Sequence, residues 1–215
     1  MLDLKGWTGM IAVIDYDAGN IKSVEKALHA LGYEAVITRD RETLLAADHV
    51  ILPGVGAFGD AMEKLHTYGL VDVIREVVDR QIPFLGICLG LQLMFESSEE
   101  APGIEGLSLM RGKIVRIPEA EGLKIPHIGW NSLTYPSKGR LFEGIEENSY
   151  VYFVHSYYLK AEEREVVKAA TEYGTLIDAS VEKGNVFGCQ FHPEKSSDVG
   201  MKILRNFLEV KGRNN

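Results

Sequence analysis

The sequence has few cysteines, no long hydrophobic run and no excess of positive charge. Only two of its 215 residues are cysteines, Cys88 and Cys189, so we expect no disulfide framework and expect both to stay thiols in a reducing compartment. No apolar run approaches the roughly 18 residues that span a bilayer, and the N-terminus lacks the basic and then apolar pattern of a secretory signal. We therefore expect no membrane association and a cytoplasmic location.

The charge balance is acidic, with 31 Asp and Glu residues against 23 Lys and Arg residues. Proteins that bind the phosphate backbone do so through clustered Lys and Arg, so we expect no nucleic-acid partner. Small molecules and other proteins remain as partners. The length suits one sizeable core, and no linker rich in Pro, Gly or Ser divides it. We predict a peripheral leader at residues 1–9 and one domain at 10–215.

The first half of the chain alternates short apolar runs with helical periodicity. The predicted strands lie at 10–14, 36–37 and 50–52, and the predicted helices at 21–31 and 70–78. This alternation is typical of βαβ units with parallel strands. Asn20 stands where the N-cap of the first helix is expected.

From about Lys113 the pattern changes to closely spaced strand candidates separated by turn residues. These candidates lie at 114–117, 150–154, 166–167 and 186–191, before a last amphipathic helix over 199–210. Such spacing favours antiparallel pairing. The predicted fold class is therefore α/β, a single domain with a central, mostly parallel sheet flanked by helices and a more antiparallel, β-rich second half.

Cys88 lies at a predicted turn between a strand and a helix, in the Gly-Ile-Cys-Leu-Gly run at 86–90. Glycines two positions to either side allow the tight turn that lifts a nucleophile out of a sheet edge. Free backbone N–H groups at the start of a helix favour thiolate over thiol. We therefore predict that Cys88 is a nucleophile, and that Cys189, in a continuous apolar run, is a buried core residue.

A thiol nucleophile needs a base, a group that orients the base, and donors for the oxyanion. Of the six histidines, His192 is the strongest candidate for the base, because it ends the apolar run 186–191 at the strand edge where α/β sites form. Glu194 follows two residues later and can orient the imidazole as the third member of a triad does. His127 and His155 stay open as alternatives.

A glycine-rich segment, Pro-Gly-Val-Gly-Ala-Phe-Gly at 53–59, follows another apolar run. It fits a tight turn, an oxyanion loop, or a dinucleotide-binding fingerprint in which Asp79 would be the acidic residue that binds the ribose. The fingerprint belongs in the first turn between a strand and a helix, which here is 15–20, so we favour the oxyanion loop. The N–H groups of Val55 and Leu89 would then face the reacting carbonyl oxygen.

Together these segments resemble the class I, or triad, glutamine amidotransferases. The resemblance rests on the Gly-x-Cys-x-Gly elbow, the Pro-Gly-x-Gly segment and the distant His-Pro-Glu, and it covers nearly the whole chain from residue 10. It implies that Cys88, His192 and Glu194 hydrolyse glutamine to glutamate and ammonia through a cysteine thioester, with no metal and no cofactor.

The candidates for binding the polar groups of glutamine are Gly54, Gly56 and Gln92, which lies one helical turn beyond Cys88. A solvent-facing Gln92 stays open as the alternative. Gly54 and Gly56 would also allow the peptide between them to flip, so that the N–H of Val55 points away until a partner binds its own substrate. Such a flip would prevent glutamine from being wasted.

Two further segments, Pro-His-Ile-Gly-Trp-Asn at 126–131 and Phe-Val-His-Ser-Tyr-Tyr at 153–158, resemble one branch of this family, the glutaminase subunits of histidine biosynthesis. That resemblance implies a heterodimer with a (β/α)₈-barrel synthase subunit, which uses the ammonia to make imidazole glycerol phosphate and aminoimidazole carboxamide ribonucleotide. Tyr157, Trp130 and Asn131 would lie near the ammonia exit or the partner face.

Other functions fit parts of the same pattern. The chain would match the amidotransferase component of anthranilate or aminodeoxychorismate synthesis, or a hydrolase of γ-glutamyl peptides that works without a partner. A regulatory subunit with an inert triad and an NAD-binding protein are the remaining alternatives.

Overall fold

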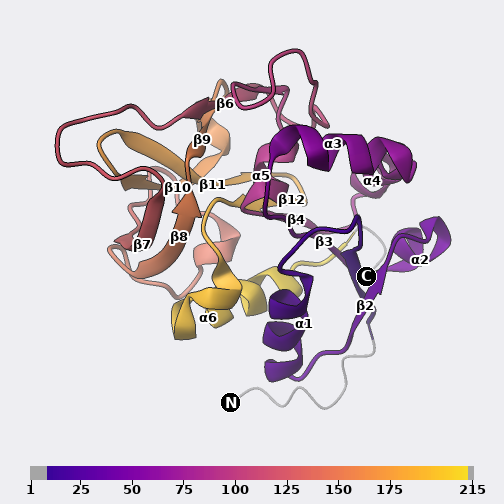
Figure 1. The fold of residues 1–215 in the computed structure, drawn as a ribbon. Coiled ribbons are helices and arrows are strands. Elements are labelled where there is room, and N and C mark those ends of the chain that lie inside the picture. Colours follow the sequence, from indigo (N-terminus) through magenta and orange to yellow (C-terminus); the bar gives the residue numbers. More distant parts are fainter. Residues whose placement is uncertain (1–8, 213–215) are drawn as a thin grey trace.

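The computed structural model describes residues 9–212, so the predicted leader at 1–9 lies outside the described residues except for Gly9. Figure 1 shows a central sheet that runs from the N-terminal half of the chain into the second half, with helices packed around it. The strand order is β2-β1-β3-β4-β12-β11-β9-β6-β5, and β10 pairs with β11 beside this path. A separate two-stranded sheet is formed by β7 and β8.

The N-terminal part of the sheet is parallel. Its strands are β1 (Ile11–Ile14), β2 (Ala35–Thr38), β3 (His49–Leu52) and β4 (Phe84–Ile87). Every residue of β1, β3 and β4 is buried, whereas the edge strand β2 is partly exposed. Continuous apolar runs of this kind are typical of parallel strands that are covered on both faces.

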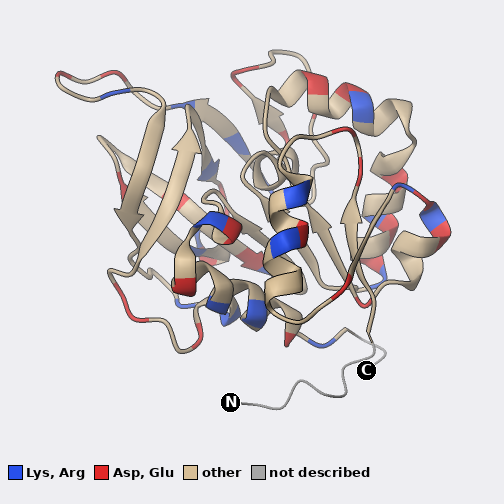
Figure 2. Ribbon diagram, turned by 60° about the horizontal axis from the view of Figure 1, so that its bottom comes forward, with Lys and Arg blue, Asp and Glu red and all other residues tan. Residues whose placement is uncertain are grey.

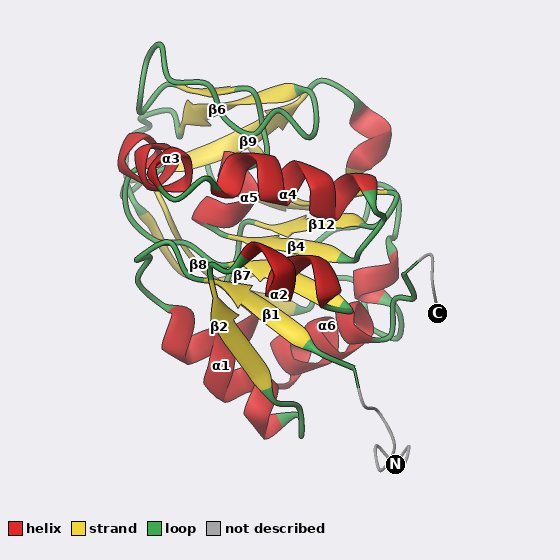
Figure 3. Ribbon diagram, turned by 90° about the vertical axis from the view of Figure 1, so that its right-hand side faces the viewer, coloured by secondary structure: helices red, strands yellow, loops and turns green. Residues whose placement is uncertain are grey.

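Helices cover both faces of this parallel part, as Figure 3 shows. On one face lie α2 (Arg41–Ala46), α3 (Phe58–Thr67) and α4 (Leu70–Asp79), and on the other lie α1 (Ile21–Ala30) and α6 (Ser197–Leu208). The two cores divide the residues of β1: Ala12 and Ile14 pack toward α3 and α4, and Ile11 and Val13 pack toward α1 and α6. This division follows from the period of two in a strand.

The second half is mainly antiparallel. Its elements are α5 (Leu89–Leu93), β5 (Ser97–Ser98), β6 (Gly112–Arg116), β7 (His127–Ser132), β8 (Tyr150–His155), β9 (Tyr157–Ala161), β10 (Val167–Glu172), β11 (Leu176–Lys183) and β12 (Val186–Cys189), with short 3-10 helices at Arg140–Phe142, Arg164–Val166 and Pro193–Lys195. The strand β12 joins the two halves, because it is parallel to β4 on one side and antiparallel to β11 on the other.

The predicted fold class is confirmed: the main sheet is mixed, parallel in its first half, and has flanking helices. Of the strand predicted at 166–167, Val167 begins the longer strand β10, whereas Val166 ends a 3-10 helix. The strand predicted at 186–191 ends earlier, at Cys189. The strands β7, β9 and β11 and the helix α2 were not predicted, because their sequences mix polar with apolar residues, and β7 also contains a glycine. Within residues 9–212 no helix is long and apolar enough to cross a membrane.

Candidate active site

Cys88 occupies a strained elbow between β4 and α5. Its φ is 53° and its ψ is −107°. Residues other than glycine rarely adopt this backbone conformation, and those that do are often found at functional sites. Its N–H donates to the carbonyl oxygen of Cys189 on the neighbouring strand at 2.7 Å. A Cβ atom at Gly86 would clash with the backbone carbonyl of Gly90, and one at Gly90 would clash with the carbonyl of Leu52. The glycines predicted to permit the turn are therefore required by packing.

The parallel pairing of β12 with β4 brings His192 to the same edge of the sheet as Cys88. Ile87 and Cys189 are partners in register, so the residues that follow each strand leave the sheet side by side. The backbone of His192 is then held against β8: its N–H donates to the Tyr152 carbonyl at 2.9 Å, and its carbonyl accepts from Ser196 Oγ at 2.6 Å. Two segments that are distant in sequence thus build one site.

His192 and Glu194 form a buried pair. The distance from His192 Nδ1 to Glu194 Oε1 is 2.7 Å, and both side chains are fully buried. Burial raises the pKa of Glu194, but hydrogen bonds from His192 and Asn20 and the charge of His192 outweigh it, so the net pKa is lowered. Glu194 is therefore an ionised acceptor, which fixes the Nδ1–H tautomer of His192.

The other ring nitrogen of His192 is left for Cys88. His192 Nε2 is buried and has no hydrogen-bonded nitrogen or oxygen partner among the described residues. Burial lowers the pKa of His192, but its interactions with Cys88 and Glu194 outweigh this effect and raise the pKa to about 9. A protonated imidazole beside the sulfur stabilises a thiolate and can later donate its proton.

Asn20 is a member of this network that the sequence did not indicate. It precedes α1, as predicted, but its side chain makes no capping hydrogen bond. Instead its Nδ2 donates to Glu194 Oε1 at 2.6 Å and lies 3.4 Å from His192 Nδ1. Its φ of 74° is in the left-handed region, where asparagine is more readily accepted than most residues. The predicted N-cap position is confirmed, but Asn20 caps with its backbone carbonyl only, because its side-chain amide is bonded to Glu194.

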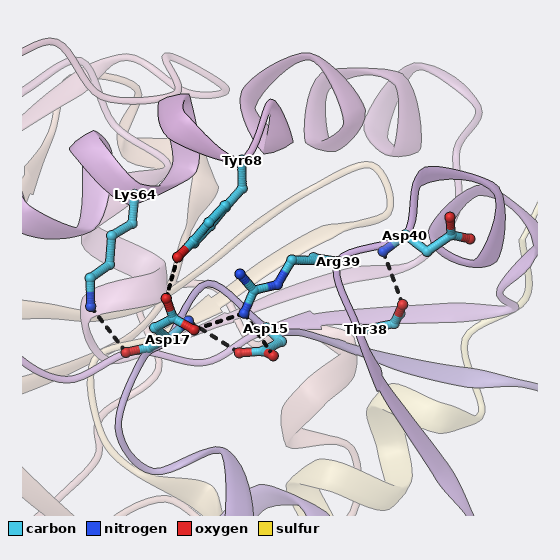
Figure 4. A network of polar contacts seen from close by, with 7 residues as sticks. All are labelled: Asp15, Asp17, Thr38, Arg39, Asp40, Lys64 and Tyr68. Carbon is cyan, nitrogen blue, oxygen red and sulfur yellow. Dashed lines mark hydrogen bonds and ion pairs between the residues drawn. The ribbon is translucent and has the colours of Figure 1, made fainter.

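The loop that ends at Asn20 is fixed from its outer side by charged and polar residues (Figure 4). Arg39 pairs with Asp15 at 3.0 Å and with Asp17 at 2.7 Å, and the hydroxyl of Tyr68 donates to Asp17. The guanidinium of Arg39 also lies over the Tyr68 ring, 4.1 Å from its centroid. Exposed ion pairs of this kind add little stability, but they define the path of the loop.

Neither of the two predicted oxyanion donors, the N–H groups of Leu89 and Val55, is available in this conformation. The N–H of Leu89 donates to the carbonyl oxygen of Gly54 at 3.3 Å. In a planar trans peptide the N–H points opposite to the carbonyl, so the N–H of Val55 faces away from Leu89. The hydroxyl of Tyr16 holds the preceding carbonyl, of Pro53, at 2.8 Å. The loop is therefore fixed in a conformation in which the carbonyl oxygen of Gly54, and not the N–H of Val55, points into the predicted oxyanion hole.

A cleft of about 260 Å³ opens beside the sulfur. It is lined by Val55, Gly56, Cys88, Leu89, Gln92, Glu100, Val154, His155, Ser156 and Tyr157. Gly56 and Gln92 lie in this lining as predicted, and Gly54 lies behind it, where a Cβ atom would approach Leu89 Cβ to 3.0 Å. Gln92 is largely buried and its Nε2 is already bonded within the protein, which leaves its Oε1 for a ligand.

The other candidate histidines form a neutral pair. His127 Nδ1 and His155 Nε2 are 3.1 Å apart, and His155 Nδ1 donates to the Tyr157 carbonyl at 2.9 Å. Burial lowers the pKa of His127 to about 4 and that of His155 to about 3. Although His155 borders the cleft, both of its nitrogens are occupied, so it is not available as the base.

The residues predicted at the partner face separate into different environments. Trp130 is 50% exposed on β7, beside Ile128 and Tyr150 at about the same exposure, and neither β7 nor β8 carries a Lys, Arg, Asp or Glu (Figure 2). Tyr157 lines the cleft. Asn131 lies on the opposite face of β7 from Trp130, since side chains alternate along a strand, and its Nδ2 donates to the Glu172 carbonyl at 2.9 Å. The structure therefore does not place Asn131 on the exposed apolar face.

The dinucleotide interpretation of 53–59 has no support in the fold. Asp79, the residue it would use to bind a ribose, is the last residue of α4. The segment also follows β3, not the first strand. Both placements differ from those of a dinucleotide-binding unit.

Comparison with known proteins identifies the family. The model of the family Glutamine amidotransferase class-I matches residues 12–210. A solved structure described as a glutamine amidotransferase covers 94% of this chain and 98% of its own, with a TM-score of 0.72 and 24% identity. The PurLQS structure from Thermotoga maritima has the same TM-score at 22% identity, covering 93% of this chain and 97% of its own. The chain belongs to the class I glutamine amidotransferases.

Curated relatives place the chain more narrowly. It is 53% identical over 200 residues to the imidazole glycerol phosphate synthase subunit HisH of Moorella thermoacetica, covering 93% of this chain and 94% of the relative. It is 49% identical over 201 residues to the HisH subunit of Methanocaldococcus jannaschii, covering 94% of this chain and all of the relative. Within its class, the chain belongs to the HisH family.

Proposed function

We propose that this chain is the glutaminase subunit of an imidazole glycerol phosphate synthase. It hydrolyses glutamine to glutamate and ammonia, and the ammonia serves a synthase subunit in histidine biosynthesis. The names and identity of the HisH relatives support this assignment. The single observation that carries the chemistry is the buried His192–Glu194 pair at the sheet edge where Cys88 turns out of β4.

In the proposed reaction the Cys88 thiolate attacks the side-chain amide carbon of glutamine. The N–H groups of Leu89 and Val55 hold the oxyanion, which requires that the peptide between Gly54 and Val55 first rotate. His192 donates its Nε2 proton to the leaving nitrogen, and ammonia departs as a γ-glutamyl thioester remains. His192 then takes a proton from water as the water oxygen attacks the thioester. Glutamate leaves with loss of one proton to solvent, and the Cys88 thiolate beside protonated His192 is restored. Glu194 keeps Nδ1 protonated throughout.

The partner in this proposal is a (β/α)₈-barrel synthase subunit that forms a heterodimer with this chain. Ammonia released into neutral water is mostly protonated and has no lone pair for attack, so a dry passage into the partner preserves the nucleophile. The uncharged, exposed face around Ile128, Trp130 and Tyr150 supports such a contact, because apolar and aromatic residues are enriched at the centres of interfaces. Tyr157 in the cleft would border the exit of ammonia.

The experiment that tests the function compares two nitrogen donors in the presence of the synthase subunit. The Cys88→Ala variant should lose synthesis from glutamine and keep synthesis from ammonium salts. The Cys189→Ala variant is the matched control, because it removes a neighbouring thiol that is fully buried, and it should keep both activities. If Cys88→Ala retained synthesis from glutamine, the proposal would be wrong.

A further inference from the structure

Gln190 lies next to the sulfur of Cys88 and has no role in the reaction derived above. It follows β12 directly, is fully buried, and its backbone N–H donates to the Ala179 carbonyl at 2.9 Å. Its side-chain Nε2 is 3.8 Å from Cys88 Sγ in hydrogen-bonding geometry. Burying a polar group is costly unless it is hydrogen-bonded, so the contact of this buried amide with Cys88 Sγ points to a chemical role.

The orientation of this amide is determined by a chain of bonds. The Tyr157 carbonyl can only accept, so the atom of Gln92 that lies 2.9 Å from it must be the donor Nε2. The second N–H of that nitrogen points to Gln190 at 3.0 Å, so the atom of Gln190 that receives it must be the acceptor Oε1. The remaining atom of Gln190, which faces Cys88, is therefore the NH₂ donor.

Besides His192, the sulfur has two polar neighbours with opposite preferences. The Val154 carbonyl, 3.9 Å from Sγ, can only accept and so favours the protonated thiol. The Gln190 amide donates, and a thiolate accepts a hydrogen bond far better than a thiol does. We propose that Gln190, held by Gln92, is a positioning residue that stabilises the Cys88 thiolate and orients it before the substrate binds.

The Gln190 variants retain the other titratable residues around Cys88. The titratable and charged groups that face this region are Tyr16 from the loop after β1, Glu100 across the cleft, His155 from β8, and His192 and Glu194 after β12. Tyr16 and His155 stay neutral, since burial raises the pKa of the first and lowers that of the second. The charge on the His192 and Glu194 pair is present in every variant below.

The test measures the rate of Cys88 alkylation by iodoacetamide as a function of pH, using the full chain in a Cys189→Ala background. Gln190→Met keeps the approximate shape of the side chain and removes the N–H donor to Sγ. The pH profile of its alkylation should shift upward by about one pH unit, which corresponds to the loss of one hydrogen bond to a charged group. Gln190→Glu keeps the acceptor for Gln92 but directs a carboxylate oxygen at Sγ, so it should shift further. Gln92→Met, which only loosens the Gln190 amide, should shift least.

This order separates a chemical role from a structural one. Coincident profiles for the parent and both Gln190 variants would overturn the proposal, and so would an equal shift in Gln92→Met and Gln190→Met. Gln190→Glu preserves the internal bond to Gln92, so it keeps the test valid if Gln190→Met unfolds.

The inference rests on the proposed function only for the role of Cys88, and alkylation reports the thiolate without glutamine turnover. A shifted profile in a protein whose Cys88→Ala variant still uses glutamine would leave this inference standing and reject the proposed function. An unshifted profile in a protein that needs Cys88 for glutamine hydrolysis would reject this inference and leave the proposed function standing.

Discussion

The backbone carbonyl of Gly54 accepts a hydrogen bond from the N–H of Leu89, with an N···O distance of 3.3 Å. The donor that should hold the oxyanion is therefore occupied by the protein itself, and the second donor, on Val55, faces away. The proposed nucleophile and its proposed base are already assembled, because His192 and Glu194 are paired next to Cys88. In this conformation the chain has the proposed triad assembled and the proposed oxyanion hole closed.

The closed hole predicts a low glutaminase rate for the chain alone. One oxyanion donor is typically worth a factor of about 10² to 10³ in kcat, so adding the synthase subunit with its bound ligand should raise kcat by at least about 100-fold if it reverses the Gly54 peptide. Glutamate release measured with and without the partner tests this. A rate that stays constant on adding the partner and its ligand would contradict the gate.

The contact between Asn20 and Glu194 predicts a loss of activity from a residue outside the triad. Asn20→Gly suits the left-handed backbone and removes only the side chain, so kcat/KM should fall about tenfold, as expected for one lost bond to a carboxylate. Asn20→Asp should be worse, since it places a second carboxylate against Glu194. Glutaminase kinetics with the partner present, alongside thermal unfolding, would show whether the loss is catalytic. Unchanged kcat/KM in both variants would exclude this role for Asn20.

Replacing members of the triad should give graded losses. His192→Ala removes the proton carrier and should cost at least about 10³-fold in kcat. Glu194→Gln should be milder, because Asn20 Nδ2 donates to the same oxygen that receives His192 Nδ1 and would keep the carbonyl end of a glutamine side chain turned toward the imidazole. Steady-state glutaminase assays of the two variants are sufficient for the comparison. Equal and complete losses would show that Glu194 does more than orient His192.

The raised pKa of His192 predicts an alkaline titration. In the folded chain its imidazole should titrate near pH 9, well above the values of about 4 and 3 for His127 and His155. Because the folded pKa exceeds the unfolded one, protonated His192 stabilises the fold fully below about pH 6.5, and this contribution is lost as the pH rises through about 9. NMR titration of labelled histidine should show this midpoint, and Cys88→Ala should lower it. A midpoint that Cys88→Ala leaves unchanged would mean that the sulfur does not interact with the ring.

Much of the architecture followed from the sequence because the signals were local. The apolar runs at 10–14 and 50–52 and the helical spacing at 70–78 indicate β1, β3 and α4 directly. The strand β7 was not predicted, since His-Ile-Gly-Trp-Asn-Ser has little β periodicity and is stabilised by its partner β8. Pairing between distant strands depends on contacts that no local window contains.

The same distinction applies to the site. Cys88 and His192 stood at recognisable strand ends, where α/β sites form. Asn20 and Gln190 could not be found in that way, because each acts through a partner more than 100 positions away in sequence, Glu194 for the first and Cys88 for the second. The closed state of the Gly54 peptide was likewise beyond the sequence, which indicated only that glycine permits rotation there.

The central claim is that the Cys88 sulfur is the atom that attacks the carboxamide of glutamine. Treatment of the chain and its synthase partner with a glutamine-analogue electrophile, followed by peptide mapping by mass spectrometry, tests this claim directly. We expect one modification per chain, on Cys88, formed in step with the loss of glutaminase activity and prevented by glutamine. A complex that loses its activity while Cys88 stays unmodified would contradict the account.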